Sequence, residues 1–117
     1  MKEKLIRAFK KGVEKCSDLL SMTVTNDNEF GWISIGNELL VIRHKMVNQA
    51  NDFRVQEVDK FDICINSEFE EELTSDEYKE LFSLLKEKYD ILWNQSRDLK
   101  REQTINKLDK YLEINEH

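Results

Sequence analysis

Apolar residues in the first twenty positions recur at the spacing of a helix. They lie three or four residues apart, which places them on one side of a helix, while lysine and arginine fill the other side. The apolar positions are Leu5, Phe9, Val13, Cys16 and Leu20. Gly12 weakens a helix by about 1 kcal/mol relative to alanine, so we interpret it as a point of close packing. The pattern predicts a helix over about residues 2–20.

From Ser21 onward the apolar positions alternate with polar ones, as in half-buried strands. Five short strands are predicted, at residues 22–25, 30–35, 38–45, 53–58 and 61–66. Links are predicted at residues 26–28, 36–37, 47–52 and 59–60, where turn-forming or polar residues cluster. Because the links are short, we expect an antiparallel meander of four or five strands with one face covered by helix.

The alternation also assigns side chains to the two faces of this sheet. Ile33 and Ile35 are expected in the core, whereas Phe30 and Trp32 point to the opposite face. Cys64 falls on the face opposite Phe61, Ile63 and Ile65. Tryptophan is enriched at protein interfaces, so Trp32 is a candidate partner-binding residue.

A second helix is predicted from about residue 75. Thr74 and Glu77 have the spacing of a capping box, with Thr74 as the N-cap. An apolar stripe follows at helical spacing and is wide enough to lie deep against the sheet. Its members are Tyr78, Phe82, Leu85, Tyr89 and Leu92, widened by Leu81, Leu84, Ile91 and Trp93.

Beyond Trp93 the apolar stripe changes direction. Leu99 continues the earlier stripe, but Ile105, Leu108 and Leu112 are rotated by about a third of a turn at 100° per residue. Either one long helix changes the face that it buries, or the helix breaks near residues 94–97 and a second helix folds back. We favour a break or kink.

Together these elements predict one α+β domain over residues 1–117: an N-terminal helix at 1–20, the antiparallel sheet at 22–66 and a long or kinked helical segment at 75–114. No basic-then-apolar leader opens the chain, and no apolar run approaches the ~20 residues of a membrane span. Two cysteines form no disulfide framework, so a reducing cytoplasm is expected. Abundant Lys, Asn and Ile are typical of AT-rich coding, as in a low-GC bacterium, its plasmid or its phage.

Negative charge is unevenly distributed within the net charge of −6. Between Glu57 and Glu80, ten carboxylates stand against only Lys60 and Lys79. One interpretation is a solvated loop followed by a helix N-terminus, where carboxylates favour the helix dipole. The other is an acidic surface that docks onto a basic partner protein, which would raise the association rate and set specificity.

Familiar catalytic, metal and nucleotide sites are not indicated. Cys64 and His44 could form a catalytic pair of thiol and base, but Cys64 is better explained as a small side chain buried in the sheet. Cys16 lies on the apolar face of the first helix and is interpreted as a core residue. Only His44 and His117 are histidines, and the two cysteines lack zinc spacing. Gly31 and Gly36 are isolated, so no phosphate loop is present. We expect no metal, no cofactor and no catalysis.

Direct nucleic-acid binding is also disfavoured. The basic face of the first helix meets the requirement for clustered cations. The net charge of the chain is negative, however, and would repel the phosphates of a nucleic acid. The late cations, such as Arg97 and Lys107, alternate with Asp98 and Asp109 as on a solvated helix. The basic face of the first helix is more consistent with offsetting the acidic stretch within the molecule.

Small size, acidity and the lack of a catalytic motif resemble, as a class, phage anti-defence inhibitors and bacterial immunity proteins. The leading hypothesis is therefore a non-enzymatic acidic inhibitor that occludes a basic nuclease, toxin or defence effector. Its partner-binding residues would be Glu68, Glu70, Glu71, Glu72 and Asp76, with Trp32. The alternative is a structural or adaptor protein that forms a homodimer through Leu99, Ile105, Leu108 and Leu112.

Overall fold

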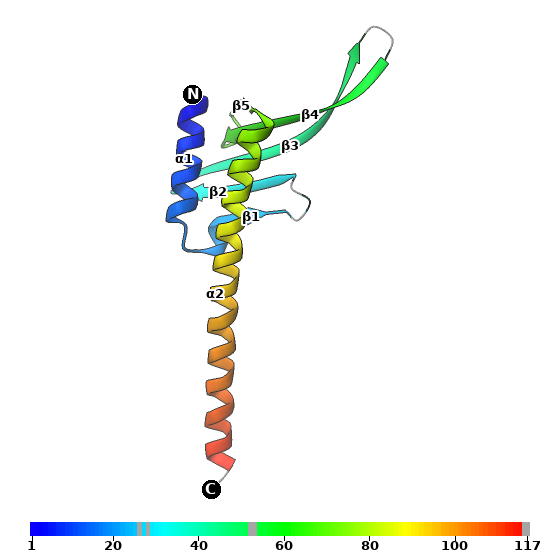
Figure 1. Ribbon diagram of the computed structural model, residues 1–117. Coiled ribbons are helices and arrows are strands. Elements are labelled where there is room, and N and C mark those ends of the chain that lie inside the picture. The colour runs from blue at the N-terminus through cyan, green and yellow to red at the C-terminus, as the bar shows by residue number, and fades with distance from the viewer. Residues whose placement is uncertain (26, 28, 52–53, 116–117) are drawn as a thin grey trace.

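The computed structural model describes residues 1–25, 27, 29–51 and 54–115, and it confirms an α+β fold (Figure 1). Its elements are α1 (Lys2–Lys15), the 3-10 turn η1 (Leu19–Ser21), β1 (Met22–Val24), β2 (Phe30–Ile35), β3 (Glu38–Asn51), β4 (Arg54–Ile65), β5 (Phe69–Leu73) and α2 (Ser75–Asn115). None of the helices in the described ranges is long and apolar enough to span a membrane.

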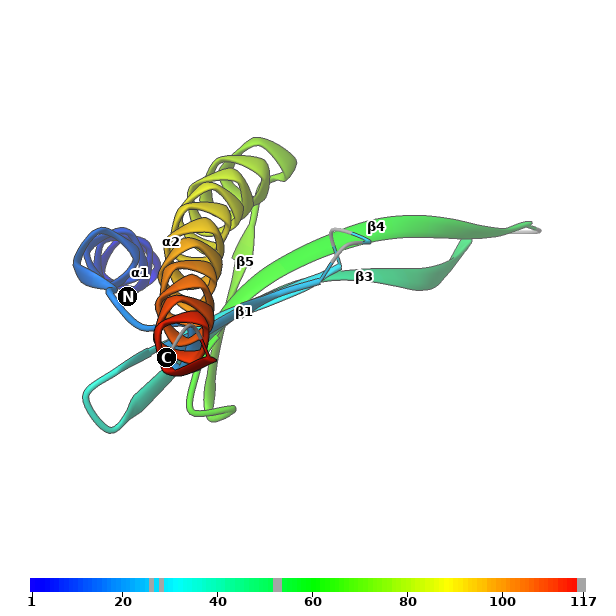
Figure 2. The same ribbon diagram turned by 90° about the horizontal axis from the view of Figure 1, so that it is seen from below.

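The five strands form one antiparallel meander in the order β1-β2-β3-β4-β5. Both helices lie on the same face of the sheet, as the view along α2 shows (Figure 2). The predicted link at residues 36–37 is a turn in which Gly36 has a φ of +60°, a conformation that glycine adopts without strain. The predicted meander with one helix-covered face is confirmed.

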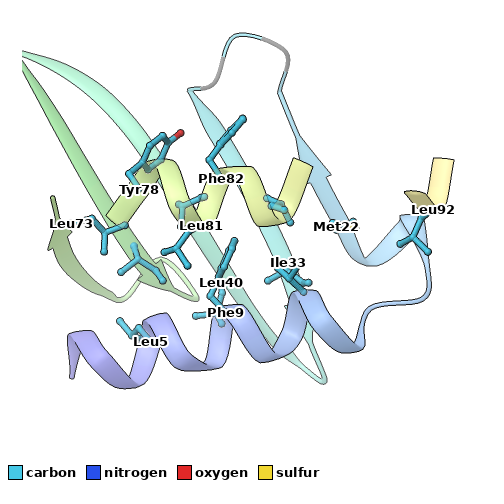
Figure 3. Packing of buried hydrophobic residues seen from close by; sticks show 14 residues of the cluster. Leu5, Phe9, Met22, Ile33, Leu40, Leu73, Tyr78, Leu81, Phe82 and Leu92 are labelled. Carbon is cyan, nitrogen blue, oxygen red and sulfur yellow. The ribbon is translucent and has the colours of Figure 1, made fainter. Parts of the chain in front are cut away.

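The core lies between this face of the sheet and the two helices (Figure 3). Helix α1 contributes the predicted residues Leu5, Phe9 and Val13, which are buried, while Ile33 comes from the sheet. Gly12 allows α1 to approach the sheet, because a Cβ atom there would lie 2.5 Å from Ile35 Cδ1. The predicted close packing at Gly12 is therefore confirmed.

Helix α1 is shorter than predicted. It ends at Lys15, because Cys16 adopts an extended conformation and the Asp18 side chain accepts a hydrogen bond from the Leu20 N–H to begin η1. Leu20 is consequently exposed rather than part of the apolar helix face. Cys16 still packs partly buried against the core, with its Sγ 3.8 Å from the Sδ of Met22.

Strands β3 and β4 form one long hairpin, which the sequence pattern divided. Residues 47–51 were predicted as a loop and residues 59–60 as a turn, but both are strand. The pairs Met46↔Asp59 and Val47↔Val58 continue the ladder through these polar segments. Strand β5 was not predicted, because its run of glutamates conceals the alternation. The predicted turn residues Asn26 and Asn28 and the strand start at Phe53 lie outside the described residues, as does His117.

Helix α2 begins at the predicted capping box. The Thr74 N–H donates to Glu77 Oε1 at 2.9 Å, and the Glu77 N–H donates to Thr74 Oγ1 at 3.1 Å. The predicted break near residues 94–97 is wrong, because α2 is one helix of 41 residues. This segment contains neither glycine nor proline, so its backbone hydrogen bonds can continue after the helix leaves the core.

Glu77 also links the two helices, since its Oε1 lies 2.7 Å from Lys2 Nζ. The hydrogen bond from Lys2 and the cap of Thr74 hold the pKa of the Glu77 carboxyl below its ordinary value. A depressed pKa stabilises the fold above the unfolded-state value and loses this contribution as the pH falls through the folded-state value. We predict that Glu77→Gln is less stable than the parent at neutral pH, and that urea denaturation shows the difference vanishing in acid. A difference that stays constant with pH would contradict the ion pair.

Two parts of the chain project from a packed body formed by the rest (Figure 1). The first is the hairpin arm, residues 45–51 and 54–60, which starts where pairing with β2 ends at Phe30↔Arg43 and pairing with β5 ends at Phe61↔Leu73. The second is the free half of α2, residues 93–115, of which the stretch up to Leu99 still borders the body at Leu19. These projections give the molecule principal extents of 83 × 31 × 21 Å.

Candidate interaction surfaces

The face of the sheet away from the helices has an apolar centre. Trp32, Val41 and Cys64 lie side by side in the register of β2, β3 and β4. Trp32 and Phe30 are partly exposed there, on the face opposite Ile33 and Ile35, as predicted. Although no helix lies on this face, Cys64 is only 1% exposed, so its neighbours cover it. Binding of a partner at Trp32 stays a prediction.

A charged network borders this apolar centre. Arg43 binds Asp62 with two hydrogen bonds, Nε to Oδ1 at 2.8 Å and Nη2 to Oδ2 at 3.2 Å, and its Nη2 also donates to Glu70 Oε1 at 2.7 Å. The hydrogen bond to Asp62, supported by Glu70, raises the pKa of the Arg43 guanidinium. Lys45 Nζ lies 3.4 Å from Asp62 Oδ2. The network holds these side chains in fixed geometry.

The predicted acidic residues do not share one surface. Strand β5 alternates, so Glu70 and Glu72 lie on the uncovered face while Glu71, opposite Ile63, lies on the other. Glu68 precedes β5 in the turn, and Asp76 is in the first turn of α2. Glu70 is already paired with Arg43, and Glu72 Oε1 lies 3.4 Å from Lys60 Nζ. Alternation and internal pairing therefore divide the acidic stretch.

The basic face of α1 neutralises further carboxylates at the start of α2. In addition to the Lys2–Glu77 pair, Lys10 Nζ lies 2.8 Å from Glu80 Oε1. Lys88 Nζ donates to the Glu14 carbonyl oxygen at 3.2 Å, which again ties α2 to α1. The expected intramolecular role of this basic face is confirmed for these pairs.

His44 and Cys64 do not form a thiol–base pair, because they point to opposite faces of the sheet. His44 stacks on Phe61 with ring centroids 4.6 Å apart, and its Nε2 lies 2.9 Å from Asp59 Oδ1. Burial raises the pKa of the Cys64 thiol, which disfavours the reactive thiolate. Within the described ranges, no group of three or more His, Cys, Asp or Glu side chains is placed to hold a metal ion.

This arrangement predicts different reactivity for the two free cysteines. Under native conditions we expect a thiol reagent to modify the partly buried Cys16 readily and Cys64 only slowly, with fast reaction of Cys64 in denaturant. The measurement is the rate of labelling followed by peptide mass mapping. Equal native rates would show that the sheet face around Cys64 is open.

A hollow that the sequence did not indicate lies where the hairpin arm meets α2. It has a volume of about 560 Å³ and is lined by His44, Asp59 and Phe61 from the sheet and by Tyr78 and Phe82 from α2, among others. Burial raises the pKa of the Tyr78 hydroxyl. The rings of His44 and Phe61 stack on the sheet wall, and Tyr78 contacts Phe61 and Phe82 with tilted rings, so this hollow is a packing junction that fixes the root of the arm.

The predicted dimerisation residues separate into two groups. Leu99 lines a shallow hollow with Leu19 and Leu92, so it is directed toward the packed body. Ile105, Leu108 and Leu112 lie further along the free half of α2 and are 49%, 57% and 56% exposed. Figure 1 shows no other described element beside this part of the helix. We call these three residues the outer stripe.

No protein-family model, curated protein or solved structure matches the chain. Its function is therefore inferred from the residues and their geometry.

Proposed function

We propose that the protein is a non-enzymatic protein-binding module that forms a homodimer through the free half of α2. The supporting observation is the outer stripe: three large aliphatic side chains, each about half exposed, on a helix that extends away from the only core of the described chain. Most helical stability in proteins comes from packing an apolar face, and here the described part of the chain supplies no such packing. A second copy would supply it.

The expected dimer is weak. Full burial of an aliphatic side chain contributes roughly 1.5–3 kcal/mol, so a half-exposed one contributes about half of that. The six side chains of two outer stripes are opposed by an association cost of about 4–15 kcal/mol. The most favourable balance of these terms leaves about 5 kcal/mol, so a dissociation constant of a few hundred micromolar or weaker is expected, consistent with reversible assembly rather than an obligate dimer.

Light scattering on a version that ends at Gln95 tests this proposal. The shortened chain keeps α1, the sheet and the core residues of α2, so it retains the packed body. We expect the mass of the full chain to rise toward that of a dimer with concentration, while the shortened chain stays monomeric. If both behave alike, and circular dichroism shows that both are folded, the helix is not the dimer interface.

The acidic-inhibitor hypothesis is a second proposal with less geometric support. It rests on the net charge of −6 and on exposed carboxylates such as Glu68 and Asp76. The partner would be a basic nuclease, toxin or defence effector in a reducing cytoplasm, consistent with two free cysteines. Reversing the charge of the acidic residues should abolish salt-sensitive capture of such a partner. The residues to reverse are Glu68, Glu70, Glu71, Glu72 and Asp76. Capture that is unchanged by the reversal would exclude this surface.

A further inference from the structure

We infer that the two copies pack parallel and in register along α2, a proposal that rests on the dimer proposed above. The observation is a repeat of seven on the exposed side of the helix. Leu84, Ile91, Ile105 and Leu112 are separated by multiples of seven residues, and all four are exposed to a third or more. Asp98 occupies the remaining position. We call these five the heptad positions.

The heptad positions extend the contact surface from the free half of α2 into the packed body. Leu84 and Ile91 line a groove of about 370 Å³ between α1 and α2, with Val13 on the opposite wall. A strict repeat of seven drifts by about 20° per heptad on a straight helix, so two such helices stay in contact by coiling around each other with a left hand. The partner helix would thus follow this groove and then the outer stripe.

The parallel orientation follows from what lies three residues after each heptad position. These positions are polar at Glu87, Asn94 and Arg101 and apolar only at Leu108. In a parallel pair each heptad position meets its own copy, so the isoleucines and leucines contact one another. In an antiparallel pair each would meet a position of the second set, which is mostly polar.

Charge at the flanks supports the same orientation. In a parallel pair, Arg97 precedes a heptad position and faces Glu102 of the second copy, which gives two opposite-charge contacts per dimer. One antiparallel competitor with a favourable charge contact pairs Asp98 with Arg101 of the second copy.

That competitor buries fewer apolar side chains. It brings Ile91 against Leu108, but it places Ile105 against Asn94 and Leu112 against Glu87. The parallel pair also brings Asp98, Glu87 and Arg101 each beside its own copy. These exposed charges contribute little compared with the apolar contacts at Leu84, Ile91, Ile105, Leu108 and Leu112, so the parallel pair is favoured.

A parallel dimer has a structural consequence for partner binding. Both packed bodies lie at the same end of the paired helices, so both hairpin arms project from one end of the assembly. Exposed apolar residues of the arm, Met46 and Val55 among them, are then presented twice to one target. Two linked contacts bind more tightly than one when the geometry allows both.

Disulfide trapping of the full chain tests the orientation. In a Cys16→Ser background, with Cys64 buried, Leu112→Cys places one thiol at a heptad position. In the parallel pair this thiol faces its own copy, and mild oxidation should give at least about ten times more cross-linked dimer than the control Leu99→Cys, whose thiol lies on another side of the helix. Ile105→Cys should behave like Leu112→Cys.

Each alternative outcome overturns the inference in a distinguishable way. If Leu112→Cys alone does not cross-link but its mixture with Glu87→Cys does, the dimer is antiparallel, and the proposed function stands without this inference. If no variant cross-links although light scattering shows a dimer, the interface is elsewhere on the helix or on the body. If no variant cross-links and the chain is monomeric, the proposed function fails as well.

Discussion

Replacing Leu108 by lysine is expected to weaken self-association by about 100-fold or more, equivalent to roughly 3 kcal/mol. Leu108 is in the middle of the outer stripe, and the parallel dimer places this residue beside its own copy. Lysine would introduce two like charges into the apolar contact and lose the buried leucine methyl groups. Size-exclusion chromatography with light scattering, over concentrations on both sides of the dissociation constant, measures the change.

Leu99→Lys is the matched control. Leu99 is 58% exposed, almost the same as Leu108, and it lies on the same helix, but it is directed toward Leu19 and Leu92 of the packed body. It should leave self-association within about threefold of the parent, since substitutions outside an interface are usually near neutral. Circular dichroism should show equal helix content in both variants. Equal effects of the two lysines on self-association would mean that the helix surface acts nonspecifically.

Phe9→Ala is expected to destabilise the fold by about 3–5 kcal/mol. Phe9 is fully buried in the core cluster, where α1 packs on the sheet (Figure 3). Domains of this size are stable by about 5–15 kcal/mol, so the loss removes a large share of the total. Urea denaturation followed by tryptophan fluorescence gives the free energy of unfolding. A loss below about 1 kcal/mol would indicate that α1 does not close the core.

Phe69→Ala provides the comparison for this substitution. Phe69 is the first residue of β5 and about half of its side chain is exposed. The same change in side-chain volume should therefore cost well under half as much, because less apolar surface is lost and no enclosed cavity forms.

The elements with a strong local pattern were predicted from the sequence. The apolar face of α1, the β2–β3 hairpin with Gly36, and the Thr74–Glu77 capping box each depend on residues close together in the chain. The hairpin arm was predicted only in part: residues 54–58 were predicted as strand, but residues 47–51 and 59–60 were not, because they are largely polar and only pairing across the hairpin, as in Lys45↔Lys60, makes them strand. Pairing between β3 and β4 therefore made these segments strand, although their local sequence does not favour a strand.

Helix α2 shows why a change of apolar face was interpreted as a break. Tyr78, Phe82, Leu85 and Leu92 face the core of the same chain, whereas the outer stripe faces away from it. Periodicity cannot distinguish a helix that changes its burial partner from two separate helices, because both shift the apolar stripe. The rotation falls between Leu99, which still lies toward Leu19 of the packed body, and Ile105, and it marks the point where the helix leaves that body.

The candidate surfaces could be predicted only in part. The opposite placement of Trp32 and Ile33 follows from strand alternation, which is a local property. The division of Glu70, Glu71 and Glu72 between two faces requires β5 to be a strand, and the pairing of Glu70 with Arg43 requires the register of three strands. Charges that are contiguous in the sequence were therefore separated in space.

Sedimentation equilibrium of the unmodified full chain tests the central claim most directly. If the free half of α2 binds a second copy, the apparent mass will increase with concentration and fit a monomer–dimer equilibrium with a dissociation constant of a few hundred micromolar or weaker. A mass equal to that of the monomer at every concentration, up to the limit of solubility, would contradict the proposed assembly.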